Sequence, residues 1–195
     1  MTSWRIERLD FDSGSVDEWS RVDPRHSNWP VVYSINGPRS IYVGETGNAM
    51  GRMRQHLGTK DGLDTVRVVI DETFNKSVCL DLESTLIRLL GGDGKFEVLN
   101  RNDGITDAEY FDRAWYRLRF DEIFDELRAA GYFDRSIPEI VNSDLFKLSP
   151  FKALTHDQAI VVESILDGLF EDLAADLSSA SLVEGHPGTG KTILA

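Results

Sequence analysis

Hydrophobic positions gather in three short runs between residues 30 and 70. Residues 31–35 and 41–44 are rich in β-branched and aromatic side chains, and they flank Asn36-Gly37-Pro38, which has the composition of a turn. These two runs predict an antiparallel hairpin. Residues 65–70 form a third β-branched run, so the pattern predicts a small three-stranded mixed sheet.

Helical periodicity follows the second and third of these runs. Asn48 can cap a helix that carries Met50, Met53 and Leu57 on one side, and a second helix is predicted from about residue 77 to residue 90. Residues 1–29 give only a weak strand signal, over residues 4–11. We therefore expect an α+β domain over residues 30–102, with helices flanking the sheet, after an N-terminal extension of residues 1–29.

The second half of the chain has the periodicity of helices. Residues 106–109 have capping-box form and open a helical connector, assigned to residues 103–150, that stops at Gly131. The apolar stripe of this connector is predicted to consist of Phe111, Ala114, Trp115, Leu118 and Leu127. Residues 151–195 begin a further module, with a second capping box at residues 155–158 and a short apolar run at Leu182-Val183.

Composition places the chain among proteins with an ordinary packed core. Of its 195 residues, 41% are hydrophobic, and no apolar run approaches the ~18 residues of a membrane helix. The first residues lack the basic and apolar segments of a secretory signal, and a single cysteine, Cys79, cannot form an internal disulfide. We expect a cytoplasmic protein with no membrane partner.

The net charge of −12 is unevenly distributed, and this changes which partners the chain can have. A strongly negative molecule repels polyanions as a whole. Residues 30–102, however, hold nine basic and nine acidic residues, so the remainder carries the entire net charge. Phosphate chemistry is therefore expected in residues 30–102, whereas the acidic helical extension offers a surface to partner proteins or to a homo-oligomer.

A carboxylate interrupts the apolar stripe of the helix predicted over residues 77–90. Glu83 lies among its i−4, i−3, i+3 and i+4 neighbours, which are Cys79, Leu80, Leu86 and Ile87. An unpaired charge is costly on an inward face, so Glu83 needs a cation or a strong donor. The alternative is that Glu83 borders the stripe and reaches water. The solvated face is expected to carry Asp81, Ser84, Thr85 and Arg88.

Arg52 and His56, spaced i and i+4, put a permanent cation and a titratable imidazole on one face of the preceding helix. A surface pair without a function has the same spacing, and strand tyrosines such as Tyr33 and Tyr42 usually pack in cores. The residues alone leave both interpretations open. Gly44, at the end of the second strand, either lets a phosphate approach the backbone closely or serves turn geometry.

The order and spacing of these residues resemble the GIY-YIG nuclease family across the whole of residues 30–102. Val31-Val32-Tyr33 stands where the family has Gly-Ile-Tyr, and Tyr42-Val43-Gly44 stands where it has Tyr-Ile-Gly. Arg52 is followed, in the family's order, by His56, Glu83 and Asn100. The resemblance implies a GIY-YIG-type three-stranded sheet and endonuclease activity on nucleic acid, which we expect to be DNA.

The resemblance also implies a role for each residue. Glu83 would hold one Mg²⁺ or Mn²⁺ ion at the scissile phosphate, and Arg52 would clamp phosphate oxygens with its planar fork. Tyr42 is the first choice for the general base and Tyr33 the alternative, although a tyrosine pKa near ~10 must be lowered for that task. His56 would orient the water or relay a proton, and Asn100 would brace the site. We expect one concave face to gather Tyr33, Tyr42, Arg52, His56 and Glu83, with Glu83 pointing into it and no second carboxylate close enough to form a two-metal centre.

A second motif lies near the end of the sequence. Residues 185–192 match the Walker A pattern, in which backbone N–H groups cradle phosphates; its positions are Gly185, Gly188, Gly190, Lys191 and Thr192. Lys191 would meet the β and γ oxygens, and Thr192 would hold Mg²⁺. Residues 154–158 resemble the segment before Walker A in superfamily 1 helicase-like proteins, including Schlafen-related ATPases, where Gln158 would contact adenine. The sequence ends three residues after Thr192, so we expect ATP binding only in a longer parent protein, and no ATPase activity here.

The leading hypothesis is a metal-dependent endonuclease that forms the N-terminal part of a nuclease–helicase protein. The alternative is a non-catalytic GIY-YIG module that holds nucleic acid or a partner protein and regulates an attached ATPase. A third hypothesis, an ATPase regulatory region, is disfavoured because the sequence has no Walker B carboxylate after the Walker A motif.

Overall fold

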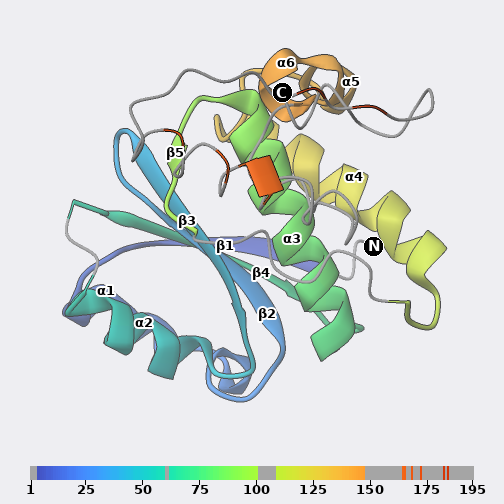
Figure 1. The fold of residues 1–195 in the computed structure, drawn as a ribbon. Helices are drawn as coiled ribbons and strands as arrows, with labels where there is room; N and C mark the ends of the chain where they lie inside the picture. The colour runs from blue at the N-terminus through green and yellow to red at the C-terminus, as the bar shows by residue number, and fades with distance from the viewer. Residues whose placement is uncertain are drawn as a thin grey trace. The chain divides into compact units, whose positions relative to one another are not determined.

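The computed structural model describes residues 4–59, 62–100 and 109–147, together with isolated positions between residues 164 and 184. The chain divides into two compact units, Met1–Phe151 and Lys152–Ala195. The helices and strands named in Figure 1 belong to the first unit. The predicted nucleotide-binding residues lie outside the described residues; they are Gln158, Gly185, Gly188, Gly190, Lys191 and Thr192.

A five-stranded mixed sheet forms the middle of the first unit (Figure 1). Its strands are β1 (Trp4–Asp10), β2 (Val31–Asn36), β3 (Ser40–Thr46), β4 (Thr65–Asp71) and β5 (Glu97–Val98). They lie in the order β1-β4-β2-β3-β5, and every neighbouring pair is antiparallel except β3 and β5, which are parallel. The fold class is therefore α+β, as the sequence predicts.

The three strands predicted from the sequence are the three central ones, and the predicted sheet is too small. β1 pairs with β4 along its whole length, from Trp4 opposite Asp71 to Asp10 opposite Thr65. As an edge strand with partly exposed side chains, β1 lacks the continuous apolar run that marks a central strand. β5 has two residues, so only its pairing with β3 defines it.

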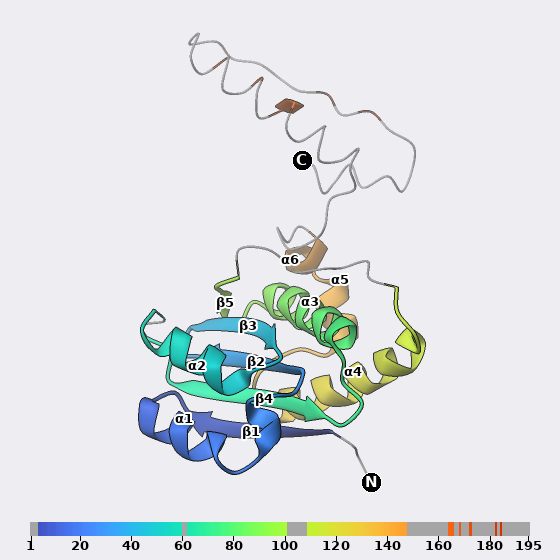
Figure 2. The same cartoon turned by 90° about the horizontal axis from the view of Figure 1, so that it is seen from below.

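Helices cover both faces of the sheet (Figure 2). On one face lie α1 (Ser13–Ser20) and α2 (Ala49–Leu57), and a short 3-10 helix, η1 (Pro24–His26), follows α1 in the chain. On the other face lies α3 (Lys76–Asp93), which is flanked by α4 (Arg113–Ala129), α5 (Ile137–Asn142) and α6 (Asp144–Lys147). The side chains of the strands contribute to two separate apolar clusters, one on each face of the sheet.

Side-chain alternation along β2 explains the two clusters. Val31, Tyr33 and Ile35 pack with α2, whereas Val32 packs with α3. Because successive strand residues point to opposite faces, a central strand covered on both sides is apolar at nearly every position. All five residues from 31 to 35 are buried.

Local capping fixes where α2 and α3 begin. The Asn48 side chain accepts a hydrogen bond from the Gly51 N–H, which confirms the predicted cap of α2. Asn75 caps α3 in the same way through the Val78 N–H, and α3 ends at Gly94, whose φ of 75° is left-handed. These two helix starts lie next to the candidate site described below.

The predicted inward face of α4 is wrong. Phe111, Trp115 and Leu118 are exposed, and of the predicted stripe only Leu127 belongs to the core. The helix also begins later than predicted, at Arg113. The sequence carries a second apolar stripe, more closely spaced and richer in aromatic residues, and this stripe packs on α3; it consists of Tyr116, Phe120, Ile123, Phe124 and Leu127.

The predicted solvated face of α3 is also wrong, because α4 and its preceding residues cover it. Asp81 and Ser84 are fully buried. Asp81 accepts hydrogen bonds from the Tyr110 hydroxyl and from Arg117, and it forms an ion pair with Arg113. A charge on this face is thus balanced by two arginines rather than by water. Among the described residues no helix is long and apolar enough to cross a membrane.

Candidate functional site

Pairing of β2 with β3 brings Tyr33 directly opposite Gly44. A Cβ atom on Gly44 would lie 2.4 Å from the Tyr33 hydroxyl oxygen, closer than any real contact allows. Glycine at this position therefore makes room for the Tyr33 ring to lie across β3. The expectation that Gly44 admits a phosphate is replaced by this packing role.

The Tyr33 hydroxyl binds two residues of α2. It lies 2.8 Å from His56 Nε2, and the Arg52 Nε–H donates to it at 3.3 Å. Of these two partners only His56 can accept the hydroxyl proton, because a guanidinium has no acceptor atom. The i and i+4 spacing noted in the sequence thus lets Arg52 and His56 contact the same group of the sheet, the Tyr33 hydroxyl.

Tyr42 completes this cluster from the neighbouring strand. Its ring meets the His56 ring edge to face at 5.1 Å and lies 6.2 Å from the Tyr33 ring. Tyr33, first, and then Tyr42 raise the pKa of Arg52 by hydrogen bonding and charge. The structure therefore brings together four of the predicted residues: Tyr33, Tyr42, Arg52 and His56.

The two tyrosines differ in their access to water. Tyr33 is 1% exposed, and burial raises its pKa well above the usual value, although Arg52 acts in the opposite direction. Tyr42 is only partly buried. Tyr33, a buried phenol that keeps its proton, is suited to positioning Arg52 and His56. Tyr42 is the tyrosine that a water molecule can reach.

Asn100 lies beside β3 and pairs with the backbone of Val43. Its Nδ2–H donates to the Val43 carbonyl at 2.8 Å, and its Oδ1 accepts from the Val43 N–H at 3.0 Å. β5 pairs only with Ser40 and Ile41, so Asn100 takes over the backbone hydrogen bonds where β5 ends. This contact fixes the strand position next to Tyr42.

Glu83 is partly buried on the inward side of α3, as its apolar neighbours predict. Burial first, and then the Glu45 carboxylate, raise its pKa to about 7, while the Glu45 backbone N–H, Lys76 and Arg52 oppose this rise. A second carboxylate, that of Glu45, therefore acts on Glu83 electrostatically. Glu45 belongs to β3, and its Oε1 forms an ion pair with Lys76, the first residue of α3.

The expected single concave face does not hold in that form. Tyr33 packs with α2, whereas α3 covers the opposite face of the sheet, so the sheet separates Glu83 from the tyrosines. The two halves approach each other around the end of β3, where Arg52 still acts on Glu83 electrostatically. An open groove, which we call the edge groove, runs around this end; it is lined by Glu45, Thr46, Asn48, Arg52, Gln55 and Lys76.

Sequence reasoning missed Glu45 and Lys76. The signal for Glu45 was present, because Ile41 and Val43 face the α3 side and a strand alternates with a period of two. Glu45 shares their face, so it is a carboxylate on an apolar face, which is the same anomaly that singled out Glu83. The only sequence signal for Lys76 is its position in the first turn of a helix, because the helix dipole favours an acidic residue there.

The carboxylate of Glu83 fits a hard divalent cation. Mg²⁺ and Mn²⁺ prefer oxygen ligands, and Mg²⁺ commonly uses one or two carboxylates and keeps several waters. The Glu45 carboxylate helps to raise the pKa of Glu83, and a cation bound nearby would offset that repulsion. Among the described residues no group of three or more histidine, cysteine or acidic side chains forms a protein-only metal cage.

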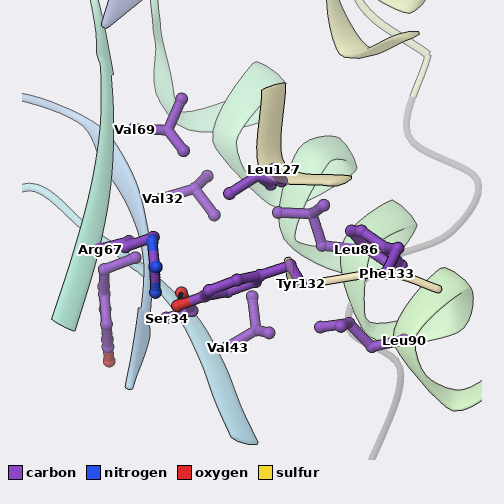
Figure 3. A pocket seen from close by; sticks show the side chains of 11 residues that line it. Val32, Ser34, Val43, Arg67, Val69, Leu86, Leu90, Leu127, Tyr132 and Phe133 are labelled. Atoms are coloured by element: carbon purple, nitrogen blue, oxygen red, sulfur yellow. Dashed lines mark hydrogen bonds between the residues drawn. The ribbon is translucent and has the colours of Figure 1, made fainter. Parts of the chain in front are cut away.

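A second hollow lies between the sheet and α3, and it is part of the core (Figure 3). Its walls are mostly apolar side chains such as Val32, Leu86 and Leu127. The Tyr132 hydroxyl bonds to Ser34 Oγ at 3.0 Å, and the Arg67 guanidinium lies 4.3 Å from the Tyr132 ring. Its polar groups therefore satisfy one another, so this hollow is part of the core and the edge groove, which Arg52 lines, is the hollow that adjoins the Tyr33 cluster.

Comparison of the chain with protein-family models, with curated proteins and with solved structures gave no match.

Proposed function

We propose that the protein is a metal-dependent endonuclease that hydrolyses phosphodiester bonds in nucleic acid, with DNA as the expected substrate. The observation that carries the proposal is the hydrogen-bonded cluster of Tyr33, Arg52 and His56, with Glu83 inside the electrostatic reach of Arg52. A permanent cation, a titratable ring and a carboxylate with a pKa near neutrality are the groups that phosphodiester hydrolysis requires.

The chain's residues divide the work as follows. Arg52, exposed at the groove, binds the non-bridging oxygens of the scissile phosphate, and Tyr33 fixes its direction. Tyr42, in its phenolate form, takes the proton of the attacking water as the water oxygen bonds to phosphorus and the bond to the leaving oxygen breaks. His56, whose ring lies against that of Tyr42, receives this proton or returns it, and the leaving oxygen gains a proton from water. Glu83 would hold one Mg²⁺ or Mn²⁺ ion, which when bound supplies positive charge and a more acidic water.

The resemblance to GIY-YIG nucleases supports the same proposal at the level of the fold. The three central strands with α2 and α3 would form the family's arrangement, to which β1 and β5 are additions. The proposal extends to a longer nuclease–helicase protein in which residues 151–195 begin an ATP-binding module.

The direct test is incubation of the chain with supercoiled plasmid, single-stranded DNA and RNA, with Mg²⁺, with Mn²⁺ and with EDTA. We expect metal-dependent nicking that Glu83→Gln abolishes. Glu72→Gln is the matched control, because Glu72 is 71% exposed and lies in a weak ion pair with Arg25. Binding of DNA without nicking by the unaltered chain in either metal would instead support the non-catalytic alternative.

A further inference from the structure

The uncharged polar side chains of the edge groove turn their donors toward it, because their acceptor atoms are engaged. Thr46 Oγ1 accepts from the Asn48 N–H at 3.0 Å, and Asn48 Oδ1 accepts from the Gly51 N–H at 2.8 Å. Gln55 Oε1 accepts from Arg52 Nη1 at 3.1 Å. Each of these three partners can only donate, so the orientation of both amides is fixed and their NH₂ groups remain for a ligand.

Two cations add to these donors. Arg52 belongs to the proposed catalytic cluster, whereas Lys76 is 64% exposed and lies on the α3 side of the groove. The carboxylate that lines the groove, Glu45, is 13% exposed and is paired with Lys76. An ammonium has three donors, and Glu45 uses one of them. The groove therefore suits an anion.

Lys76 is an unfavourable residue for its place in the helix. The N-terminal turn of a helix favours acidic side chains, and the first turn of α3 contains none. Glu45 holds the Lys76 ammonium at the groove, although among the described residues its second oxygen, Oε2, is buried without a hydrogen-bond partner. The position of Lys76 is unfavourable with respect to the helix dipole, and its ion-pair partner Glu45 has an unsatisfied oxygen. Because this arrangement does not favour stability, we interpret it as serving a ligand.

We propose that Lys76 binds a backbone phosphate of the nucleic-acid strand adjacent to the phosphate held by Arg52. The inference deepens the proposed function and rests on it. Arg52 comes from the α2 side of the groove and Lys76 from the α3 side, so a strand bound by both passes around the end of β3. On this path the scissile phosphate lies between the tyrosines on the α2 side of the sheet and Glu83 on the α3 side.

The test measures binding by a double variant that leaves the net charge unchanged, Lys76→Met with Glu45→Gln, so that neither partner remains buried alone. The matched control is Lys95→Met with Asp134→Asn, which removes another exposed ion pair, of 2.6 Å. Fluorescence anisotropy follows a short labelled duplex in EDTA, where no cleavage occurs, over a range of KCl concentrations. Circular dichroism establishes that both variants are folded.

We expect the Lys76 double variant to bind roughly fivefold to tenfold more weakly at about 0.1 M salt, with a salt slope smaller by about 0.9, the value of one phosphate contact. In the unaltered chain, one neutral methylphosphonate at the linkage next to the scissile phosphate should cause the same loss, and it should cause no further loss in the variant. Equal weakening by the two double variants, or an unchanged salt slope, would overturn the contact.

Inorganic phosphate, added at constant ionic strength, distinguishes a strand contact from a site for a free anion. We expect it to displace the duplex no better than chloride does, and efficient displacement that the Lys76 double variant loses would overturn the strand contact. Cleavage by a chain whose binding ignores Lys76 would sink this inference and leave the proposed function standing. Lys76-dependent binding without cleavage in any metal would do the reverse.

Discussion

Burial next to a second carboxylate makes Glu83 costly for the folded chain. Because its folded pKa of about 7 exceeds the ordinary value of 4.5, the folded state binds the proton more tightly than the unfolded state. Stability from this group is therefore full below pH 4.5 and is lost as the pH rises to about 7. If Glu83 holds the metal as proposed, the chain gives up stability at this position for function.

Glu83→Gln should therefore stabilise the metal-free protein above pH 7 by about 1–2 kcal/mol, a value reduced for the partial exposure of the group. Below pH 4.5 the variant and the unaltered chain should have equal stability. Urea unfolding at several pH values measures the difference. A destabilised variant at high pH would show that Glu83 holds the fold together and would remove it as a metal ligand.

Tyr33 and Tyr42 should respond differently to loss of their hydroxyls. Tyr33→Phe removes the hydroxyl that bonds to Arg52 Nε and to the buried His56 Nε2, so we expect a loss of about 1–3 kcal/mol in unfolding free energy. Tyr42→Phe should cost less stability, and it should lower kcat by a factor of roughly 10²–10⁴ because the proposed general base is lost. Denaturant unfolding and single-turnover cleavage test the pair. A larger loss of rate in a fully stable Tyr33→Phe protein would assign the base to Tyr33.

At the scale of elements, the contact of β3 with the Tyr33 ring depends on Gly44. Gly44→Ala places a Cβ 2.4 Å from the Tyr33 hydroxyl, so the strand or the ring must move. We expect a loss of about 1–3 kcal/mol in stability, together with loss of cleavage, because Arg52 and His56 depend on that hydroxyl. Gly47→Ala, which meets nothing within 4 Å, is the control and should change stability by less than about 0.5 kcal/mol. Equal stabilities in thermal melting would contradict this packing role.

Elements with strong local signals could be predicted from the sequence. The β2–β3 hairpin follows from its turn and its apolar runs, and α2 follows from Asn48 as its cap. β5 could not be predicted, because two residues carry no periodicity and only their partner strand defines them. The prediction of the inward face of α4 was wrong because the sequence of α4 has two apolar stripes, and only packing on α3 decides between them.

The candidate site was predictable as a set of residues and not as a geometry. Spacing brought Arg52 and His56 to one hydroxyl, but the sequence does not show on which face of the sheet a helix packs. The placement of α2 and α3 on opposite faces is a property of the whole sheet. That placement moves the site from a single concave face to the end of β3, where Glu45 and Lys76 enter it.

At the scale of the whole molecule, the chain divides into two compact units after Phe151. Among the described residues, both apolar clusters that hold the sheet draw on positions between Trp4 and Phe146. The proposed catalytic residues also lie inside this unit. A chain of residues 1–151 should therefore fold cooperatively and nick plasmid in Mn²⁺ at the rate of the full chain, with a melting temperature within about 2–4 °C of it. Calorimetry and a nicking assay compare the two chains, with Glu83→Gln in the short chain as the inactive control. A short chain that melts without cooperativity, or that folds but does not cut while the full chain does, would show that residues 152–195 contribute to the core or to the site.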